Sequence, residues 1–451
     1  MNKKQGIMDK LIVFLEKYLE PVAAKIENQR HISTIKNGMI ALMAVLMVGS
    51  FSLIIMAIGG MFPDGSAVKM FFERYNTLIS LPFRFTFGLL SVYCAVSISY
   101  NHARQLKIPF LHAIIGGLLT TLVLNIKLVG DEVNIEYLDS RGLFIAIFAS
   151  LITVETMAFF MKNKITIRIK GLPDGIAQTF EAIIPLVTVL FGAVLVDALV
   201  IHFTGGSNLP EAFTTFLAPS INSIDTPYAI FLISFLEMIF WFIGLNGYAI
   251  LIGFVLPFMT QYLGENAAAY AAGLPIPHVF APNFWDYFLG FSGSGITGAL
   301  VILALFSKSK ELKAIGKASV VPAIFTISEP VVFGLPVVYN PYLFIPFVFG
   351  TPCIGVFAYY VFKLGIVRPP IANVGGTPIP LAQYLATMDW KAVVLGFVIL
   401  GLAVCMYYPF FKMYERKILE EENIESDRKA AFDALDLKIK KNIRRKNEYY
   451  Y

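Results

Sequence analysis

The chain has 451 residues and a formal net charge of +5, and a chain of this length ordinarily holds about three soluble domains. Its composition argues against them. Hydrophobic residues make up 57% of the chain and charged residues 15%, whereas soluble domains carry about 25% charged residues. A fold in water cannot bury so large an apolar fraction. We therefore predict an all-α polytopic membrane protein whose solvent is the lipid bilayer.

The N-terminal residues 1–30 form the first predicted segment. Positions 8–28 alternate apolar and charged residues at helical spacing, which indicates an amphipathic helix lying on the membrane surface. The segment lacks the short apolar core and small-residue cleavage site of a secretory signal peptide. Residues 307–318 show the same amphipathic pattern more weakly.

Apolar stretches long enough to cross a bilayer follow along the chain. A hydrocarbon core of about 30 Å needs about 20 helical residues. The sequence predicts about ten crossings, some of them short or broken. The candidate stretches are 38–61, 82–100, 110–128, 143–161, 182–203, 227–242, 248–263, 298–306, 341–361 and 392–410.

The distribution of lysine and arginine predicts the orientation in the membrane. Residues 129–140 and 204–227 contain neither. Because basic loops stay on the cytoplasmic side, both termini are expected in the cytoplasm. These runs are read as solvated loops, and no nucleic-acid partner is predicted. The basic segments are 1–37, 101–108, 161–170, 307–318 and 412–451, the last within a charged tail predicted as a cytoplasmic helix over 413–451.

Cysteine and histidine indicate no cofactor. Cys94, Cys353 and Cys405 each lie within an apolar run and are expected to be packing residues rather than a disulfide, a zinc site or a reactive thiol. The five histidines are far apart in the sequence, without the spacing of metal ligands. We therefore predict neither a metal nor a cofactor.

The strongest interruption of the apolar pattern is residues 319–346. Pro322, Pro330, Pro336 and Pro341 with Gly334 prevent one straight helix, and we predict a re-entrant hairpin that enters the membrane and returns. Glu329 stands directly before a proline, with no basic residue within ten positions. An ionisable group inside a span is a candidate functional residue, here a carboxylate that accepts hydrogen bonds from sugar hydroxyls. The alternative is a glutamate that caps a broken helix end.

Three weaker interruptions carry polar side chains. Asn246 lies between two glycines and is either a ligand-binding amide or a helix cap. Asn283 and Trp285 belong to an aromatic run that suits a pyranose ring or, alternatively, the membrane interface. Residues 373–378 form another unwound stretch.

Three further acids fall inside predicted spans. Glu155, Asp197 and Glu237 could line a proton or sodium pathway, or they could pair with backbone and neighbouring helices. Both interpretations remain open from the sequence.

Five motifs together carry a resemblance that extends over nearly all of residues 8–412. The chain resembles the IIC membrane component of the bacterial phosphotransferase system, in its lactose/cellobiose/diacetylchitobiose family. The motifs, in chain order, are LEKYLEPVAAKIENQRHISTIKNGMIALMAVLMVGS, ITIRIKGLPDGIAQTFEAIIP, WFIGLNG, NFWDYFLGFSGSG and ISEPVVFGLPVVYNP.

The resemblance implies a division of the membrane-embedded part. Residues 31–205 would form an N-terminal domain that makes a homodimer, and residues 206–412 a sugar-binding domain with two re-entrant hairpins. Glu329 matches the family glutamate that binds the hydroxyl to be phosphorylated. A separate cytoplasmic IIB protein, supplied by IIA, would donate the phosphoryl group from its phosphocysteine, so no catalytic residue is predicted on this chain. The predicted substrate-binding residues are Glu329, Asn246, Trp285, Asn283, Asn340, Asn373 and Thr377.

Two positions depart from the family pattern. Asn246 replaces a histidine, and Gly375 stands where the family has a tryptophan. The amide still forms hydrogen bonds but takes up no proton, and the glycine removes a stacking surface. We therefore expect a wider or more polar pocket for a β-linked disaccharide or β-glucoside. The alternatives are a sugar transporter that works without IIB and a sugar-sensing paralogue that does not transport.

Overall fold

Helices dominate the computed structural model, which describes residues 29–60, 62–129, 132–169, 171–335 and 337–448 and the isolated positions 14, 17, 18, 21 and 25. Within these residues the only strands are β1 (Lys127–Val129) and β2 (Glu132–Asn134), a short antiparallel hairpin that pairs Lys127 with Asn134. The predicted all-α class is confirmed. The amphipathic helix expected over 8–28 lies almost entirely outside the described residues.

The first half of the chain forms α3 to α10. These helices are α3 (Arg30–Gly60), α4 (Ala67–Ile79), α5 (Leu81–Thr86), α6 (Leu90–Leu106), α7 (Phe110–Asn125), α8 (Leu143–Lys162), α9 (Asp174–Thr204) and α10 (Leu209–Ile224). Short 3₁₀ turns are η2 (Phe87–Leu89), η3 (Glu136–Leu138) and η4 (Ser140–Gly142).

The second half is more interrupted. Its helices are α11 (Pro227–Phe242), α12 (Gly247–Ala271), α13 (Pro282–Phe284), α14 (Gly298–Leu305), α15 (Lys310–Ile324), α16 (Glu329–Gly334), α17 (Thr351–Lys363), α18 (Leu381–Thr387) and α19 (Lys391–Glu448). There are two π-helical turns. The first, η5 (Trp285–Leu289), directly follows α13, and the second, η6 (Pro346–Gly350), leads directly into α17.

Six described helical segments are long and apolar enough to cross a membrane, and two shorter apolar helices accompany them. The long segments are Arg30–Met56, Ala67–Leu106, Ser140–Lys162, Gly175–Thr204, Gly247–Ala271 and Lys391–Ile424. The shorter helices are Phe110–Asn125 and Pro227–Phe242.

One predicted crossing is wrong. Residues 298–306 form α14, whose eight residues are about 12 Å long and do not reach across a bilayer. The cause is the following segment, because α15 turns back and packs along α14. Residues 307–318, expected on the membrane surface, begin this hairpin arm with an amphipathic pattern, in which Leu312 and Gly316 are buried and the lysines are exposed.

Polar side chains set the starts of several helices. Ser66 accepts from Lys69 N at the start of α4, and Thr226 accepts from Ala229 N at the start of α11. Asn208 and Glu211 form a reciprocal capping box on α10. Such caps each contribute about 1 kcal/mol, and they place breaks between apolar runs that hydropathy alone does not separate.

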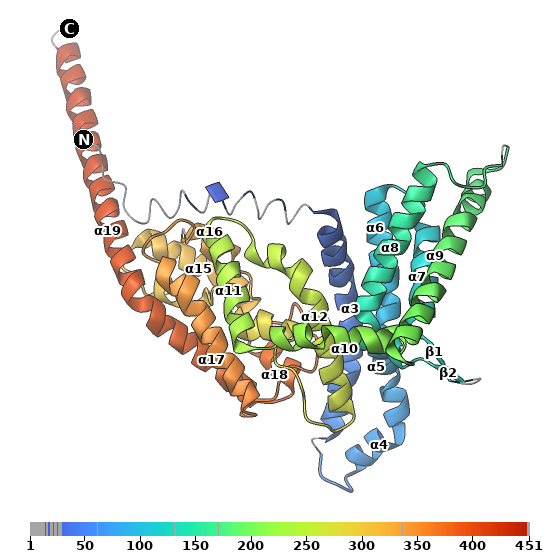
Figure 1. Ribbon diagram of the computed structural model, residues 1–451. Helices are drawn as coiled ribbons and strands as arrows, with labels where there is room; N and C mark the ends of the chain where they lie inside the picture. The colour runs from blue at the N-terminus through green and yellow to red at the C-terminus, as the bar shows by residue number, and fades with distance from the viewer. Residues whose placement is uncertain are drawn as a thin grey trace.

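Two groups of helices are visible in Figure 1. Helices α6, α7 and α8 pack against one another and against α3 and α9, while α11 packs on α17, and α14 on α15 and α19. Helix α3 also contacts α12 and so joins the two groups. A single large cluster of buried residues runs from α3 to α19 through this contact.

The re-entrant hairpin is formed by α15 and α16. Gly334, near the end of α16, lies against Ile315 of α15, so α16 runs back along α15 from a tip at residues 325–328. Pro330 occupies the first turn of α16, where a missing N–H is harmless. Helix α15 carries the tip about 21 Å away from Lys310.

A second non-helical segment, residues 290–297, packs against this tip. Ser292, Gly293, Gly295 and Ile296 all have positive φ. A methyl group added to Gly293 would lie 3.0 Å from Ser328 Cα, so glycine permits the two segments to touch. The two interrupted segments therefore meet inside the helical domain.

Helix α19 fastens the opposite end of the hairpin. Glu415 accepts hydrogen bonds from Ser307 Oγ at 2.6 Å and Lys308 N at 2.8 Å. About two helical turns further along α19, Glu422 accepts hydrogen bonds from Ser309 Oγ at 2.7 Å and Glu311 N at 3.0 Å. The N–H groups at the start of α15, which have no partner within their own helix, are thus satisfied by α19.

The prediction for the cysteines holds at one position. Cys94 is buried in α6, but Cys353 in α17 and Cys405 in α19 are exposed. An apolar run in a membrane protein has one face toward protein and another toward lipid, so it does not imply burial. The expectation of three packing thiols is wrong for these two residues.

A charged cluster secures the connections at the end of α12. His278 contacts Glu265 at 2.7 Å and Asp225 at 3.4 Å and stacks on Tyr262. Burial disfavours the imidazolium, but the two acids outweigh burial and raise the pKa of His278 to about 9. His278 therefore ties Glu265 of α12 to Asp225, the residue that follows α10.

The cluster predicts a pH-dependent stability. Because the pKa of His278 is raised from 6.5, its stabilisation is complete below pH 6.5 and is lost as the pH rises through about 9, in all about 3 kcal/mol. We expect the thermal midpoint in detergent to fall between pH 7 and pH 9.5. His278→Gln should remove this slope, whereas His202→Gln on the exposed face of α9 should keep it. An unchanged slope in His278→Gln would contradict the assignment.

Candidate functional site

A cavity of about 510 Å³ lies where the two interrupted segments meet. Three parts of the chain form its wall, namely the α11–α12 connection, the η5 turn with the residues after it, and the hairpin tip. The lining residues are Trp241, Asn246, Tyr248, Trp285, Asp286, Gly290, Ser294, Phe325, Thr326, Ile327, Ser328, Glu329 and Pro330. We call this space the Glu329 cavity.

Glu329 is the first residue of α16 and lines the cavity with an exposed side chain. Its carboxylate has no hydrogen bond or ion pair with any residue that the structure describes. Ser328, which precedes it, caps nothing with its side chain. The carboxylate therefore faces the cavity with all its acceptor positions open to a ligand.

Asn246 caps a helix, as one of the two interpretations predicted, and it also lines the cavity. Its Oδ1 accepts a hydrogen bond from Ala249 N at 2.9 Å and so caps α12. The same residue is exposed and lines the cavity. Since the cap uses only the carbonyl oxygen, the amide Nδ2 offers its N–H donors to the cavity.

Trp285 is held in place by a buried acid. Its Nε1 donates to Glu237 Oε2 at 2.7 Å, and Ser294 Oγ donates to Glu237 Oε1 at 2.8 Å. Glu237 therefore fixes two walls of the cavity relative to each other. The indole has no free N–H for a ligand, and its ring is almost completely buried, with Phe280 stacked on it and Tyr248 in edge contact.

The charged groups of the cavity wall are all acidic. Asp286 and Glu329 line it, and no lysine, arginine or histidine does. A site of this composition accepts hydroxyl donors and disfavours a ligand that carries negative charge.

Four predicted substrate-binding residues do not line the Glu329 cavity. Asn340 Oδ1 accepts from Tyr342 N at 3.0 Å and closes a turn. Asn283 accepts from Val374 N at 3.4 Å, and Asn373 Oδ1 accepts from Gly375 N at 3.1 Å. Thr377 is half-buried in the same stretch. The three asparagines therefore bind backbone groups of the non-helical stretches in which or beside which they lie.

Gly375 also lies outside the cavity wall. A methyl group built on it would meet Met43 and Asn373 rather than open space. Of the two departures from the family pattern, only Asn246 contributes directly to the cavity.

Several cavity residues were not predicted as ligands. Trp241, Tyr248, Asp286 and Ser294 lie within or next to the motifs quoted above, yet nothing in their spacing indicates which way their side chains point. The buried partner Glu237 was predicted either as part of an ion pathway or as an acid paired within the protein, and not as a support of the cavity wall.

The acids proposed for an ion pathway are each bound by protein groups. Glu237 accepts from Trp285 and Ser294, and Asp197 accepts from Leu209 N at 3.1 Å. Glu155 pairs with Arg30. The second interpretation, pairing with backbone and neighbouring helices, describes all three.

The fold and the cavity together define a polytopic helical transport protein with a carboxylate-bearing re-entrant hairpin. Comparison with known proteins agrees. The family model "Phosphotransferase system, EIIC" matches residues 36–351. The chain therefore belongs to the phosphotransferase system EIIC family and is the membrane-embedded sugar permease component of such a system.

Individual relatives extend the similarity over more than nine tenths of the chain. The chain is 29% identical over 439 residues to the lichenan permease IIC component of Bacillus subtilis, covering 92% of this chain and 96% of that protein. It is 28% identical over 443 residues to the cellobiose-specific EIIC component of Geobacillus stearothermophilus, covering 93% and 97%. The lactose-specific EIICB component of Lacticaseibacillus casei is 30% identical over 432 residues, with 91% and 72% covered.

A solved structure has the same fold. The crystal structure of the transporter ChbC, the IIC component from an N,N'-diacetylchitobiose-specific phosphotransferase system, matches with a TM-score of 0.83 and 27% identity. The match covers 91% of this chain and 99% of that one.

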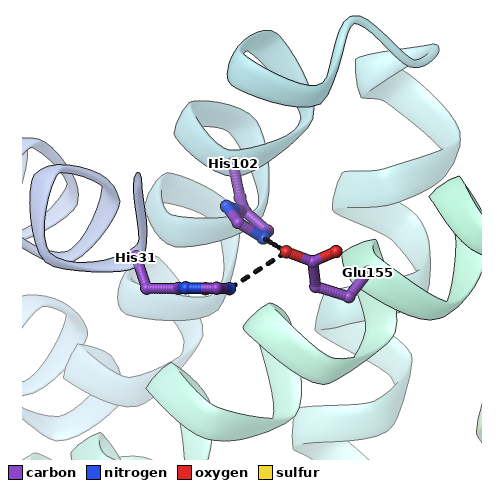
Figure 2. Close-up of side chains that lie close together, drawn as sticks. All are labelled: His31, His102 and Glu155. Atoms are coloured by element: carbon purple, nitrogen blue, oxygen red, sulfur yellow. Dashed lines mark hydrogen bonds and ion pairs between the residues drawn. The ribbon is translucent and has the colours of Figure 1, made fainter. Parts of the chain in front are cut away.

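A separate cluster joins the start of α3 to α6 and α8. His31 Nε2 and His102 Nε2 each lie 3.0 Å from Glu155 Oε1, as Figure 2 shows, and Arg30 Nη2 lies 2.6 Å from the same oxygen. The two histidines are 71 positions apart in the sequence, which is why spacing gave no sign of the cluster.

Two histidines and a glutamate are residue types that bind zinc, but the hydrogen bonds of the cluster favour a structural ion pair between Arg30 and Glu155. A bound cation would need Glu155 Oε1 as a ligand. The permanently charged Arg30 guanidinium already occupies that oxygen. Gln29 Oε1 accepts from Ile32 N, so its Nε2 donates to His31 Nδ1 at 3.0 Å and leaves the His31 proton on Nε2. That proton points at Glu155. We therefore assign the cluster a structural role.

Replacing Glu155 tests this role. Glu155→Gln removes the charge that three donors share, and because the side chains are partly exposed we expect a loss of about 1–2 kcal/mol of stability. The measurement is thermal unfolding in detergent, with the exposed Glu420→Gln of α19 as control. Zinc that stabilises the unaltered protein but not Glu155→Gln would instead support a metal site.

Proposed function

We propose that this permease binds a neutral β-linked disaccharide or β-glucoside in the Glu329 cavity and presents it to a separate IIB protein for phosphorylation. The names of the relatives, lichenan, cellobiose and lactose permeases, support this substrate class. The observation that carries the proposal is the unpartnered Glu329 carboxylate at the tip of an intramembrane hairpin. IIA is the proposed upstream donor to IIB.

Glu329 would act by accepting hydrogen bonds from sugar hydroxyls. A carboxylate on a short helix at a fixed hairpin tip orients one hydroxyl toward an incoming phosphoryl group. Charge-assisted hydrogen bonds of this kind contribute about 1.5–3 kcal/mol each. The Asn246 amide would donate to a second sugar oxygen, and the half-buried ring of Tyr248, which packs on the buried Trp285, would cover an apolar ring face.

The acidic wall supports release of the product. Phosphorylation gives the sugar two negative charges, and the cavity holds Asp286 and Glu329 without a basic residue. Repulsion would lower the affinity for the product, and the added charge would prevent its return through lipid.

We further propose the arrangement that the resemblance implies. Residues 31–205 would form the dimerisation domain and 206–412 the sugar-binding domain. In the most apolar stretch of α9 only 11% of the residues are buried. This exposed apolar surface is suitable for contact with a second copy of the chain. The basic α14–α15 connection and both termini would face the cytoplasm.

Glu329→Gln is the direct test of the cavity. The amide loses the charged acceptor, so we expect sugar binding to weaken at least about tenfold, with expression unchanged. Binding is measured by calorimetry on the purified protein, and phosphorylation with phosphorylated IIB. Glu311→Gln, an exposed glutamate at the start of the same hairpin, is the matched control. Near-normal binding by Glu329→Gln would exclude Glu329 from the site.

A sugar panel tests the substrate class. Because Asn246 replaces a histidine, we expect a pocket that accepts cellobiose and lactose as well as N,N'-diacetylchitobiose. The measurement is the affinity of the purified protein for each. A strict preference for the acetylated sugar would contradict the expected polarity, and binding of none would contradict the class itself.

A further inference from the structure

A second cavity, of about 650 Å³, lies at the other end of α19. Its polar and aromatic wall consists of Tyr270, Arg368, Tyr384, Asp389, Trp390 and Lys391, and Leu53 and Met56 of α3 close one side. We call it the outer cavity. None of its residues belongs to the Glu329 cavity.

The length of α19 places this cavity on the opposite face of the membrane from the basic hairpin. Lys391 lines the cavity, and Glu415 binds Ser307 and Lys308 between α14 and α15. The helix path between Lys391 and Glu415 is about 36 Å, slightly more than a hydrocarbon core. With the basic connection in the cytoplasm, the outer cavity opens to the side from which sugar arrives.

The charged residues of the outer cavity are held in a fixed arrangement. Asp389 accepts from Arg368 N at 3.1 Å and Lys391 N at 3.0 Å. Arg368 donates to Met388 O and lies over the Tyr270 ring at 5.2 Å, and Lys391 Nζ donates to Ile366 O at 2.8 Å. Both cations already have acceptors and an acid lies between them, so the wall suits a neutral polyhydroxyl ligand better than an anionic headgroup.

The aromatic residues supply the other half of a carbohydrate site. Trp390 is 67% exposed, and Tyr270 and Tyr384 are half-buried. Sugars have apolar faces and polar edges, and pockets that bind them combine ring surfaces with a few fixed polar groups. The volume of the cavity exceeds that of the Glu329 cavity, which is proposed to hold a disaccharide.

A hydrogen-bonded partition separates the two cavities. Trp285 and Asp286 of η5 line the Glu329 cavity, and the next residue, Tyr287, bonds to the other side. Its hydroxyl donates to Val374 O at 3.0 Å, and its carbonyl accepts from Gln383 Nε2 at 3.2 Å. Tyr384, directly after Gln383, lines the outer cavity. The contact between η5 and α18 therefore lies between the Glu329 cavity and the outer cavity.

We propose that the outer cavity is a second carbohydrate-binding site, which holds the same neutral disaccharide before it passes the partition to Glu329. This inference rests on the proposed function, because the sugar is that of the Glu329 cavity. Trp390 is the residue whose ring the sugar contacts.

The three tryptophans of the chain allow each cavity to be observed separately. In the variant Trp241→Phe/Trp285→Phe/Glu329→Gln only Trp390 fluoresces and the Glu329 cavity is disabled. In Trp241→Phe/Trp390→Phe only Trp285 reports. Both purified proteins are titrated with cellobiose, lactose and N,N'-diacetylchitobiose, and size-exclusion profiles confirm that they are folded.

We expect a sugar that changes Trp285 emission also to change Trp390 emission in a saturable manner. A sugar seen by Trp285 and not by Trp390 would overturn the outer site and leave the proposed function intact. Silence of both tryptophans toward the whole panel would overturn both proposals. A Trp390 response to phosphatidylglycerol vesicles but to no sugar would identify a lipid headgroup site instead.

Uptake kinetics provide a second measurement that does not depend on multiple substitutions. Trp390→Ala should raise the KM for uptake about fivefold while kcat changes little, because only the first contact is weakened. Phe397→Ala, an exposed aromatic residue of α19 outside the cavity, is the control. An unchanged KM in Trp390→Ala would contradict the proposal.

Discussion

Backbone polar groups inside a bilayer have no water to bind, and this constraint determines how the Glu329 cavity is built. The two non-helical segments meet each other and take their remaining partners from neighbouring helices. The Gly295 carbonyl, for example, accepts from Tyr407 Oη at 2.7 Å and from Thr351 Oγ1 at 3.3 Å. Glu237 does the same for side chains by binding Trp285 and Ser294. Glu329 is left as the acceptor that the protein itself does not use.

The charge of the cavity fits a permease that hands its sugar to a phosphoryl donor. A carrier driven by ions needs a titratable group that changes partner during transport, whereas Glu155, Asp197 and Glu237 are each bound within the protein. In a phosphorylation-driven system the change of charge occurs on the sugar. The protein then needs only a wall that accepts hydroxyls and repels phosphate, and the two acids that line the cavity, Asp286 and Glu329, are of the type that this proposal requires.

The sequence predicted those features that depend on local chemistry. Proline and glycine spacing located the hairpin, and composition indicated the bilayer, because both act within a few residues. The side-chain cluster of His31, His102 and Glu155 could not be predicted, since helix packing alone brings these positions together. The short α14 was mistaken for a crossing because hydropathy measures apolarity and not whether the next helix turns back. Asn340 and Asn373 carry the polar signal of a site, but they satisfy the backbone beside it.

Helix α19 runs without interruption from Lys391 to Glu448 and touches the outer cavity at its start and the base of the hairpin at Glu415 and Glu422. Pro409 lies inside the helix between these two points and removes one backbone hydrogen bond there, so the helix bends most easily at this residue. The base of the hairpin and the outer cavity therefore belong to one element with a single built-in joint.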